Sequence, residues 1–335
     1  MSHPRPRSAR ALLLASIAFA AVTSLMLPPA HAAAPMVGTQ APGYYRIMVG
    51  AIEVTALSDG TIDFPMDTLL VGEPSSQIRA AYKSAFQGLP AETSMNQFLI
   101  NTGGKLVLVD TGAGAFFGPT LGDTVASLRA SGYRPEQVDE VVITHMHADH
   151  TGGLVQDGEP TFKNAVVHIG RADLDFWMNP ANEAKAPEGV RASFNVAQKA
   201  LAPYIAAGKL KPFDGQVVIA PGVTAVPAPG HTAGHMYYAV ESKGEKLLVW
   251  GDVVHSAAVQ FRDPSVRIAW DSDDHAAEAA REKVLADAAR GGYLIAGAHL
   301  PFPGLGHVTR AAAGQGYVFV PVTYSANRKP PASAP

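Results

Sequence analysis

The feature that most restricts this chain is a run of metal-binding side chains directly after a short apolar segment. Residues 140–144 are mostly apolar, and a His-x-His-x-Asp-His run follows, made of His145, His147, Asp149 and His150. A continuous apolar segment of this length is typical of a buried strand. Because residues two apart on an extended chain point the same way, His145 and His147 can reach one metal ion. After the chain turns, Asp149 and His150 can face a second ion.

Three later segments each carry one more metal-binding side chain beside a predicted strand. His231 lies on a glycine-bounded loop, Asp252 follows the apolar segment 247–251, and His299 follows another predicted strand end. Loops at strand ends gather functional side chains over a rigid scaffold. Any one of these histidines alone would more often be an ordinary core or surface residue. Together with the first run, they predict a site with several metal ligands.

The composition removes several other kinds of site and partner. None of the 335 residues is cysteine, which excludes disulfides, cysteine-ligated zinc, iron–sulfur clusters and thiol nucleophiles. The formal net charge is −3 and no basic stripe stands out, which argues against a nucleic-acid partner. Mixed imidazole and carboxylate ligands favour Zn²⁺, although manganese, iron and cobalt bind similar donors.

The first 32 residues predict a secretory signal peptide. Arg5, Arg7 and Arg10 precede the apolar segment 11–27, and a small-x-small cleavage pattern ends at Ala32. A membrane anchor is the alternative, but the apolar segment is short and a cleavage pattern follows it. We therefore expect a periplasmic or secreted protein that has no membrane association after cleavage.

The remainder predicts one domain over 33–328 and a loose tail over 329–335. Strand pairs joined by tight turns alternate with single helices. This order predicts an α+β fold in which two mixed sheets pack together with helices outside, giving four layers. The expected elements include a hairpin turn at 58–60, a helix over 119–130 and a helix over 273–290 that is closed by glycines.

On these motifs the sequence resembles the metallo-β-lactamase-fold hydrolase superfamily, over nearly the whole chain after the signal peptide. The resemblance implies a four-layer αβ/βα sandwich with two divalent metal ions. It also implies a role for each residue of the run and of the later segments. By resemblance the first ion is held by His145, His147 and His231, the second by Asp149, His150 and His299, and Asp252 bridges both.

The resemblance and the residues together indicate how such a site would work. Two divalent ions about 3.5–4 Å apart lower the pKa of a shared water and polarise the bond under attack. The resulting hydroxide is the nucleophile, so no serine or cysteine is required, and Asp149 and Asp252 take part in catalysis. In the family Asp110 orients a ligand histidine. We expect His235 to support the loop of His231.

Within the superfamily, four segments resemble the methyl parathion hydrolase branch, which comprises organophosphate triesterases and related lactone- and aryl-ester hydrolases. They are 106–112, 117–122, 292–296 and 299–304. The resemblance implies an aromatic pocket, which favours a small neutral aromatic ester, lactone or organophosphate as substrate. The expected pocket residues are Phe117, Trp177, Phe194, Ile268, Trp270 and Phe302. A homodimer is compatible with the aromatic content.

The resemblance weakens just beyond Asp252 and at 268–270. There the triesterases carry aliphatic or small groups, whereas this chain has His255, Ile268 and Trp270. A planar lactone or aryl ester tolerates a narrow slot, but a tetrahedral phosphotriester needs more room. We therefore predict a lactone or aryl-ester hydrolase with weak organophosphate triesterase activity, in which His255 contacts the substrate or pocket water. The alternative for this residue is that His255 points to solvent.

Two other functions stay open at this point. One is a dedicated methyl-parathion-type organophosphate triesterase. The other is a catalytically silent metal-binding protein, which would be expected to have lost ligands, although all seven are present here.

Overall fold

The structure is a computed structural model that describes residue 1, residues 34–312 and residues 315–325. The predicted signal peptide, apart from its first residue, and the predicted tail at 329–335 lie outside the described residues. The chain divides into two units, 1–41 and 42–335, and every element below belongs to the second unit. No helix of the described part of the chain has both the length and the apolar character needed to cross a membrane.

Two seven-stranded mixed sheets form the centre of the second unit. In spatial order the first sheet contains β1 (Tyr44–Val49), β2 (Ile52–Phe64), β4 (Ala91–Asn101), β5 (Leu106–Val109), β6 (Glu140–Val142), β9 (Val166–Gly170) and β10 (Leu210–Phe213). The second sheet contains β11 (Val217–Ala220), β12 (Val223–Pro227), β13 (Met236–Ser242), β14 (Glu245–Val249), β16 (Leu294–Ala296), β17 (Leu305–Arg310) and β18 (Tyr317–Pro321). Within the first sheet β5, β6, β9 and β10 run parallel, and within the second β14 and β16 do.

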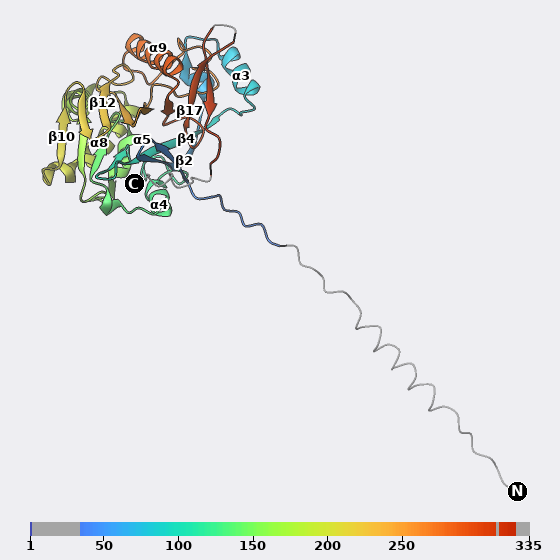
Figure 1. Cartoon of the computed structure of the whole chain (residues 1–335), viewed down its shortest axis with the longest axis horizontal. Coiled ribbons are helices and arrows are strands. Elements are labelled where there is room, and N and C mark those ends of the chain that lie inside the picture. The colour runs from blue at the N-terminus through green and yellow to red at the C-terminus, as the bar shows by residue number, and fades with distance from the viewer. Residues whose placement is uncertain (2–33, 313–314, 326–335) are drawn as a thin grey trace. The chain divides into compact units, whose positions relative to one another are not determined.

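Helices lie outside the two large sheets (Figure 1). The longer ones are α3 (Ser75–Ser84), α4 (Thr124–Ala130), α6 (Arg171–Trp177), α8 (Glu188–Ala206) and α9 (Asp274–Gly291). The shorter ones are α2 (Met66–Leu69), α5 (Ala148–Thr151) and α7 (Pro180–Lys185). Two-stranded pairs join β3 (Leu70–Val71) to β15 (Arg267–Ile268) and β7 (Val155–Gln156) to β8 (Glu159–Pro160).

Three apolar clusters fill the spaces between the layers. One lies between the sheets and includes Phe98 and Tyr238. A second joins the first sheet to α8 and includes Phe194, and a third joins the second sheet to α9 and includes Trp250. Because apolar strands such as β5 are covered on both faces, they read as continuous apolar runs. The predicted four-layer α+β fold is confirmed.

Local details correct two of the expected elements. The predicted turn at 58–60 is wrong, because β2 continues through it with a shift in register against β4. The side chain of Asp59 instead points inward and accepts hydrogen bonds from the backbone N of Ala113 (2.9 Å) and of Thr124 (3.0 Å). The helix predicted from 119 begins only at Thr124, because Leu121 forms a β-bridge with Gly60. Helix α9 follows its prediction, capped by Asp273 and closed by Gly292 at φ +64°.

Candidate metal centre

Four loops bring the candidate ligands to one edge of the sandwich. His145 follows β6, His231 lies between β12 and β13, Asp252 follows β14, and His299 follows β16. Because β14 and β16 are parallel neighbours, their carboxyl ends meet at the same edge. The loop after β6 then turns into α5, which carries Asp149 and His150.

The side chains form two groups that share Asp252, and in each group the ligand atoms lie within 4.8 Å of one another. In the first group, His147 Nδ1 lies 2.9 Å from His145 Nε2 and 3.1 Å from His231 Nε2. Asp252 Oδ2 completes this group, 3.3 Å from His231 Nε2. These three histidines come from two loops that are distant in the sequence.

The second group has the same compactness. Asp149 Oδ2 lies 3.4 Å from His150 Nε2 and 3.6 Å from His299 Nε2. Asp252 Oδ1 lies 3.2 Å from His150 Nε2, and Asp252 Oδ2 lies 3.0 Å from His299 Nε2. The carboxylate of Asp252 therefore faces both groups.

These spacings and two unpaired atoms fit a pair of metal ions. Ligand bonds of about 2.0–2.1 Å in a tetrahedral site place neighbouring ligand atoms about 3.3–3.4 Å apart, and the spacings above lie on both sides of that value. His150 Nε2 and Asp252 Oδ1 are buried, and neither has a hydrogen-bond partner among the described residues. Because buried polar atoms are rarely left unpaired, a cation between them is the simplest explanation. The cluster therefore suits a dinuclear metal site.

Most ligand histidines are oriented through their second ring nitrogen. Asp110 Oδ2 lies 2.8 Å from His150 Nδ1, and Asp271 Oδ1 lies 2.8 Å from His231 Nδ1. Thr144 Oγ1 and the Ser94 carbonyl lie 3.1 and 3.4 Å from the Nδ1 atoms of His145 and His299. A carboxylate or carbonyl holds the proton on the outer nitrogen, which leaves the inner nitrogen free to bind a metal.

The ionisable side chains of the site differ in the direction in which their pKa values are shifted. Burial, reinforced by His231, lowers the pKa of His147 to about 3. Burial opposes the charged form of His231 as well, but its hydrogen bonds with Asp252 and Asp271 raise its pKa to about 9. Burial alone would raise the pKa of Asp252, but the histidines around it, His150 and His299 foremost, hold it well below the usual range. Metal binding to such a site displaces protons from the histidines.

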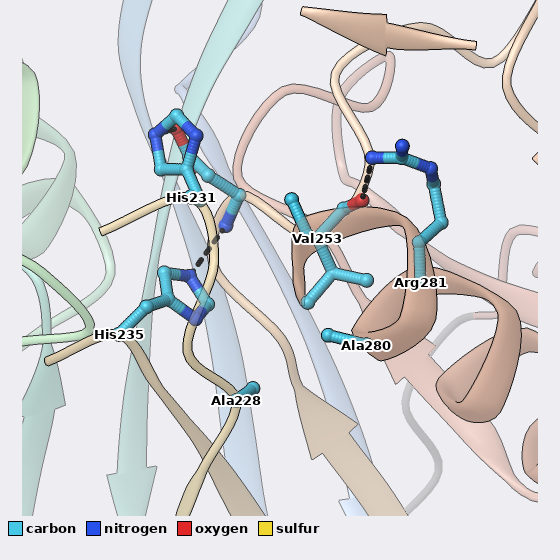
Figure 2. A pocket seen from close by; sticks show the side chains of 8 residues that line it. Ala228, His231, His235, Val253, Ala280 and Arg281 are labelled. Atoms are coloured by element: carbon cyan, nitrogen blue, oxygen red, sulfur yellow. Dashed lines mark hydrogen bonds and ion pairs between the residues drawn. The ribbon is translucent and has the colours of Figure 1, made fainter. Parts of the chain in front are cut away.

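His235 belongs to neither ligand group. Its Nε2 accepts a hydrogen bond of 3.1 Å from the backbone N of Asp252. It lines a cavity of about 10 Å³ behind the metal site together with His231 and Arg281. Figure 2 shows the two histidine rings on one side of this cavity, and the guanidinium of Arg281 on the other side, bonded to the carbonyl of Val253.

His255 is buried, with only 2% of its surface exposed, so the alternative in which it points to solvent is wrong. Its Nε2 lies 3.1 Å from Asp252 Oδ2. Its ring stacks on that of His299 with a centroid distance of 5.2 Å and an interplanar angle of 16°. His255 is thus packed between the shared carboxylate and a ligand of the second group.

The predicted pocket residues occupy different positions around the site. Trp177 meets the ring of His147 edge-on at 5.6 Å, whereas Phe194 is fully buried behind Trp177. Trp270 packs on Phe64 at 4.9 Å and reaches His255 at 5.9 Å.

The remaining three have other neighbours. Ile268 is fully buried in a cluster with Met66 and Ile78, against which Trp270 also packs. Phe117 packs against Phe116, and Phe302 is exposed.

Two aspartates that position ligands of the first group were not predicted from the sequence. Asp271 holds His231, as described above. Asp173 is buried on α6, where it accepts hydrogen bonds from the backbone N of Met146 (2.9 Å) and Gly234 (2.6 Å) and from Thr232 Oγ1 (2.8 Å). It joins the two loops that carry the first ligand group. The only sequence sign of Asp271 was its position directly after Trp270.

Comparisons with known proteins agree with this geometry. A crystal structure of hydrolase AbOPH in the beta lactamase superfamily is 37% identical, with a TM-score of 0.81, and the match covers 86% of this chain and all of that one. AidC, described as a dizinc quorum-quenching lactonase in complex with a product, is 28% identical, with a TM-score of 0.78, and the match covers 84% of this chain and 98% of that one.

Curated relatives match over a shorter length. A probable metallo-hydrolase of Mycobacterium bovis is 28% identical over 194 residues, which are 50% of this chain and 60% of that relative. The family model of the metallo-beta-lactamase superfamily matches residues 92–308, a span that includes every candidate ligand. Since that span is more than half of the chain, the chain belongs to the metallo-beta-lactamase superfamily.

Proposed function

We propose that the chain is a dinuclear metal hydrolase that cleaves neutral esters, with lactones and aryl esters preferred over phosphotriesters. The observation that carries this proposal is the convergence of two ligand groups on one shared carboxylate, Asp252. A catalytically silent protein would have no need to keep both groups complete.

The residues present fit two divalent ions, and we propose zinc because the similar lactonase is described as a dizinc protein. His145, His147 and His231 would hold one ion, Asp149, His150 and His299 the other, and Asp252 both. When bound, two such ions supply a water acidic enough to act as a nucleophile near neutral pH, together with Lewis-acid polarisation of the substrate.

The chain's own side chains prepare the site for this chemistry. Asp110 and Asp271 hold a proton on the outer nitrogens of His150 and His231, so that the inner nitrogens face the position of the ions. His255 donates its Nε2–H to Asp252, because a carboxylate can only accept. The edge of Trp177 against His147 excludes water from one side of the site. Removing water strengthens every electrostatic interaction inside.

The preference for lactones rests on two observations. First, the similar lactonase is matched over nearly its full length. Second, His255 and Trp270 lie in contact beside the shared carboxylate, where they reduce the room for a tetrahedral phosphorus centre. Because the sequence also resembles methyl parathion hydrolase, the proposal includes a weak organophosphate triesterase activity.

A substrate panel tests this function. Zinc-loaded protein is assayed on dihydrocoumarin, 4-nitrophenyl acetate and methyl parathion. We expect dihydrocoumarin to have the highest kcat/KM and methyl parathion the lowest. Absence of turnover on all three, with two ions bound, would favour the silent metal-binding protein, and a preference for methyl parathion would favour the dedicated triesterase.

Export forms a separate part of the proposal and rests on the arginines and the apolar segment before Ala32. We expect the mature protein to begin near Ala33 in the periplasm or the medium. N-terminal sequencing of the exported material tests this. Soluble cytoplasmic protein that begins at Met1 or Ser2 would refute it.

A further inference from the structure

A cavity beside His299 is lined by none of the predicted pocket residues. Its volume is about 90 Å³, and its walls come from the end of α3, the start of β4, and the segments 255–257 and 299–301. Because His255 and His299 both line it, the cavity reaches the metal centre. Sites for whole drug-sized ligands measure about 300–1,000 Å³, so this cavity suits one small part of a substrate.

A pair of buried hydroxyl groups forms one wall of the cavity. Tyr82 and Ser256 both line it, and only 4% and 3% of their surfaces are exposed. Tyr82 Oη lies 2.9 Å from Ser256 Oγ, and either oxygen can donate to the other. That bond uses one of the two hydroxyl protons. Neither oxygen bonds elsewhere in the described part of the chain, so the second proton is free for an acceptor on a ligand.

An acceptor also lines the cavity, namely the exposed residue Glu92. Glu92 accepts a hydrogen bond from Thr61 through Oε1 at 2.9 Å, which leaves its other carboxylate oxygen free. No cationic side chain among the described residues lies within ion-pair distance of Glu92. The cavity therefore offers a donor at the buried Tyr82–Ser256 pair and an acceptor at Glu92.

A hydroxyl group matches this arrangement better than the other common substituents do. It accepts from the buried pair and donates to the carboxylate. A carboxylate on the substrate has no proton to donate and meets the negative charge of Glu92. An alkyl or aryl group leaves the buried hydroxyl proton unpaired, and an unpaired buried polar group is costly.

We propose that this cavity, the Tyr82–Ser256 pocket, binds a hydroxyl group of the substrate, so that hydroxylated esters or lactones are the preferred substrates. The proposal rests on the proposed ester hydrolysis and specifies its substrate class. Sites that hydrogen-bond a substrate hydroxyl discriminate strongly against analogues that lack it, because their own polar groups are then unpaired.

The test compares dihydrocoumarin with its derivatives that carry one hydroxyl on the aromatic ring, using zinc-loaded protein. We expect at least one derivative to exceed the parent by about 5- to 10-fold in kcat/KM, mainly through a lower KM. This effect is smaller than the discrimination that fully enclosed sites reach. Methylating that hydroxyl should abolish the advantage, because the ether cannot donate.

A double variant locates the effect in the pocket. In Tyr82→Phe/Ser256→Ala the ratio of hydroxylated to parent kcat/KM should fall close to one, whereas each single variant keeps one hydroxyl proton that can still be donated and should lower the ratio less. The matched control is Tyr204→Phe, which also removes a buried tyrosine hydroxyl, here one bonded to the Leu154 carbonyl at 3.0 Å and remote from the cavity. This control should keep the ratio.

Two results would overturn the proposal. One is that no hydroxylated derivative exceeds the parent, and the other is that the advantage survives in the double variant. Failure of the proposed function gives a different result, because dihydrocoumarin itself would then not be cleaved.

Discussion

The two ligand groups share Asp252 but are braced differently. Asp173 connects the two loops of the first group through three hydrogen bonds of 2.6–2.9 Å. In the second group, the outer nitrogen of His299 lies 3.4 Å from the Ser94 carbonyl, and the side chain of Asp149 is 14% exposed. The first group is therefore more rigidly positioned than the second.

This difference predicts an order of metal affinity. Ligands that are already positioned lose less freedom when they bind. The extra carboxylate of Asp149 in the second group acts in the opposite direction. Outer partners that position metal ligands change metal affinity by about 10–100-fold. We therefore expect the first group to hold its ion more tightly.

The largest expected effect comes from removing the carboxylate that the groups share. Asp252→Ala takes one ligand from each group, so at least one ion should be lost and turnover should fall to near background. The loss should exceed the roughly 10–100-fold cost of removing an outer partner. Metal analysis and kcat/KM on dihydrocoumarin measure it. Full activity with two bound ions would exclude the shared role of Asp252.

A matched pair of variants separates the groups. Asp271→Asn removes an outer carboxylate from the first group, and Asp110→Asn removes one from the second. Each should weaken zinc binding about 10–100-fold in a titration against a competing chelator. Asp271→Asn should affect the tighter binding step, and Asp110→Asn should affect the weaker one.

The control for this pair is Asp214→Asn, which changes an exposed aspartate paired with Arg171. It should leave both steps unchanged. If Asp271→Asn weakens only the looser step, the order of the two groups is reversed.

Asp173→Asn tests the bracing of the first group through folding. The amide replaces one accepting oxygen with a donor, so either the Gly234 N–H or the Met146 and Thr232 donors lose their partner. A buried unsatisfied group costs about 1–3 kcal/mol. Urea unfolding of chelator-treated protein should show this decrease in the free energy of unfolding. An unchanged midpoint would show that the two loops are held by other contacts.

The smallest expected effect concerns substrate choice at His255. His255→Leu removes the hydrogen bond to Asp252 and makes this side of the site apolar. We expect the ratio of methyl parathion to dihydrocoumarin kcat/KM to rise about 10-fold, a typical magnitude for a change of pocket shape. Because a ratio of kcat/KM reports differential transition-state binding, an unchanged ratio would reject a role of His255 in specificity.

The fold class and the residues that converge at the site could be predicted because each leaves a local mark. The ligand residues follow apolar strand segments, and strand order places the strand ends together. The bounds of individual strands and helices were harder to predict from the sequence. Residues 58–60 look like a turn, but Asp59 is held inward by the distant Ala113 and Thr124. The sequence of β17 has no regular apolar alternation, so it does not predict a strand.

The positioning residues could not be predicted for a related reason. Asp173 and Asp271 are ordinary polar residues in their local sequence, and their importance arises only from contacts across 27 to 61 residues. The Tyr82–Ser256 pair spans 174 residues. Such pairs leave no periodic pattern, so they become visible only once the layers are packed.

The most direct measurement is zinc titration of chelator-treated protein with dihydrocoumarin hydrolysis followed at each step. We expect two ions per chain in two distinguishable steps, with most activity appearing as the second, weaker site fills. Full activity at one ion per chain, or without any ion, would contradict a dinuclear centre built around Asp252.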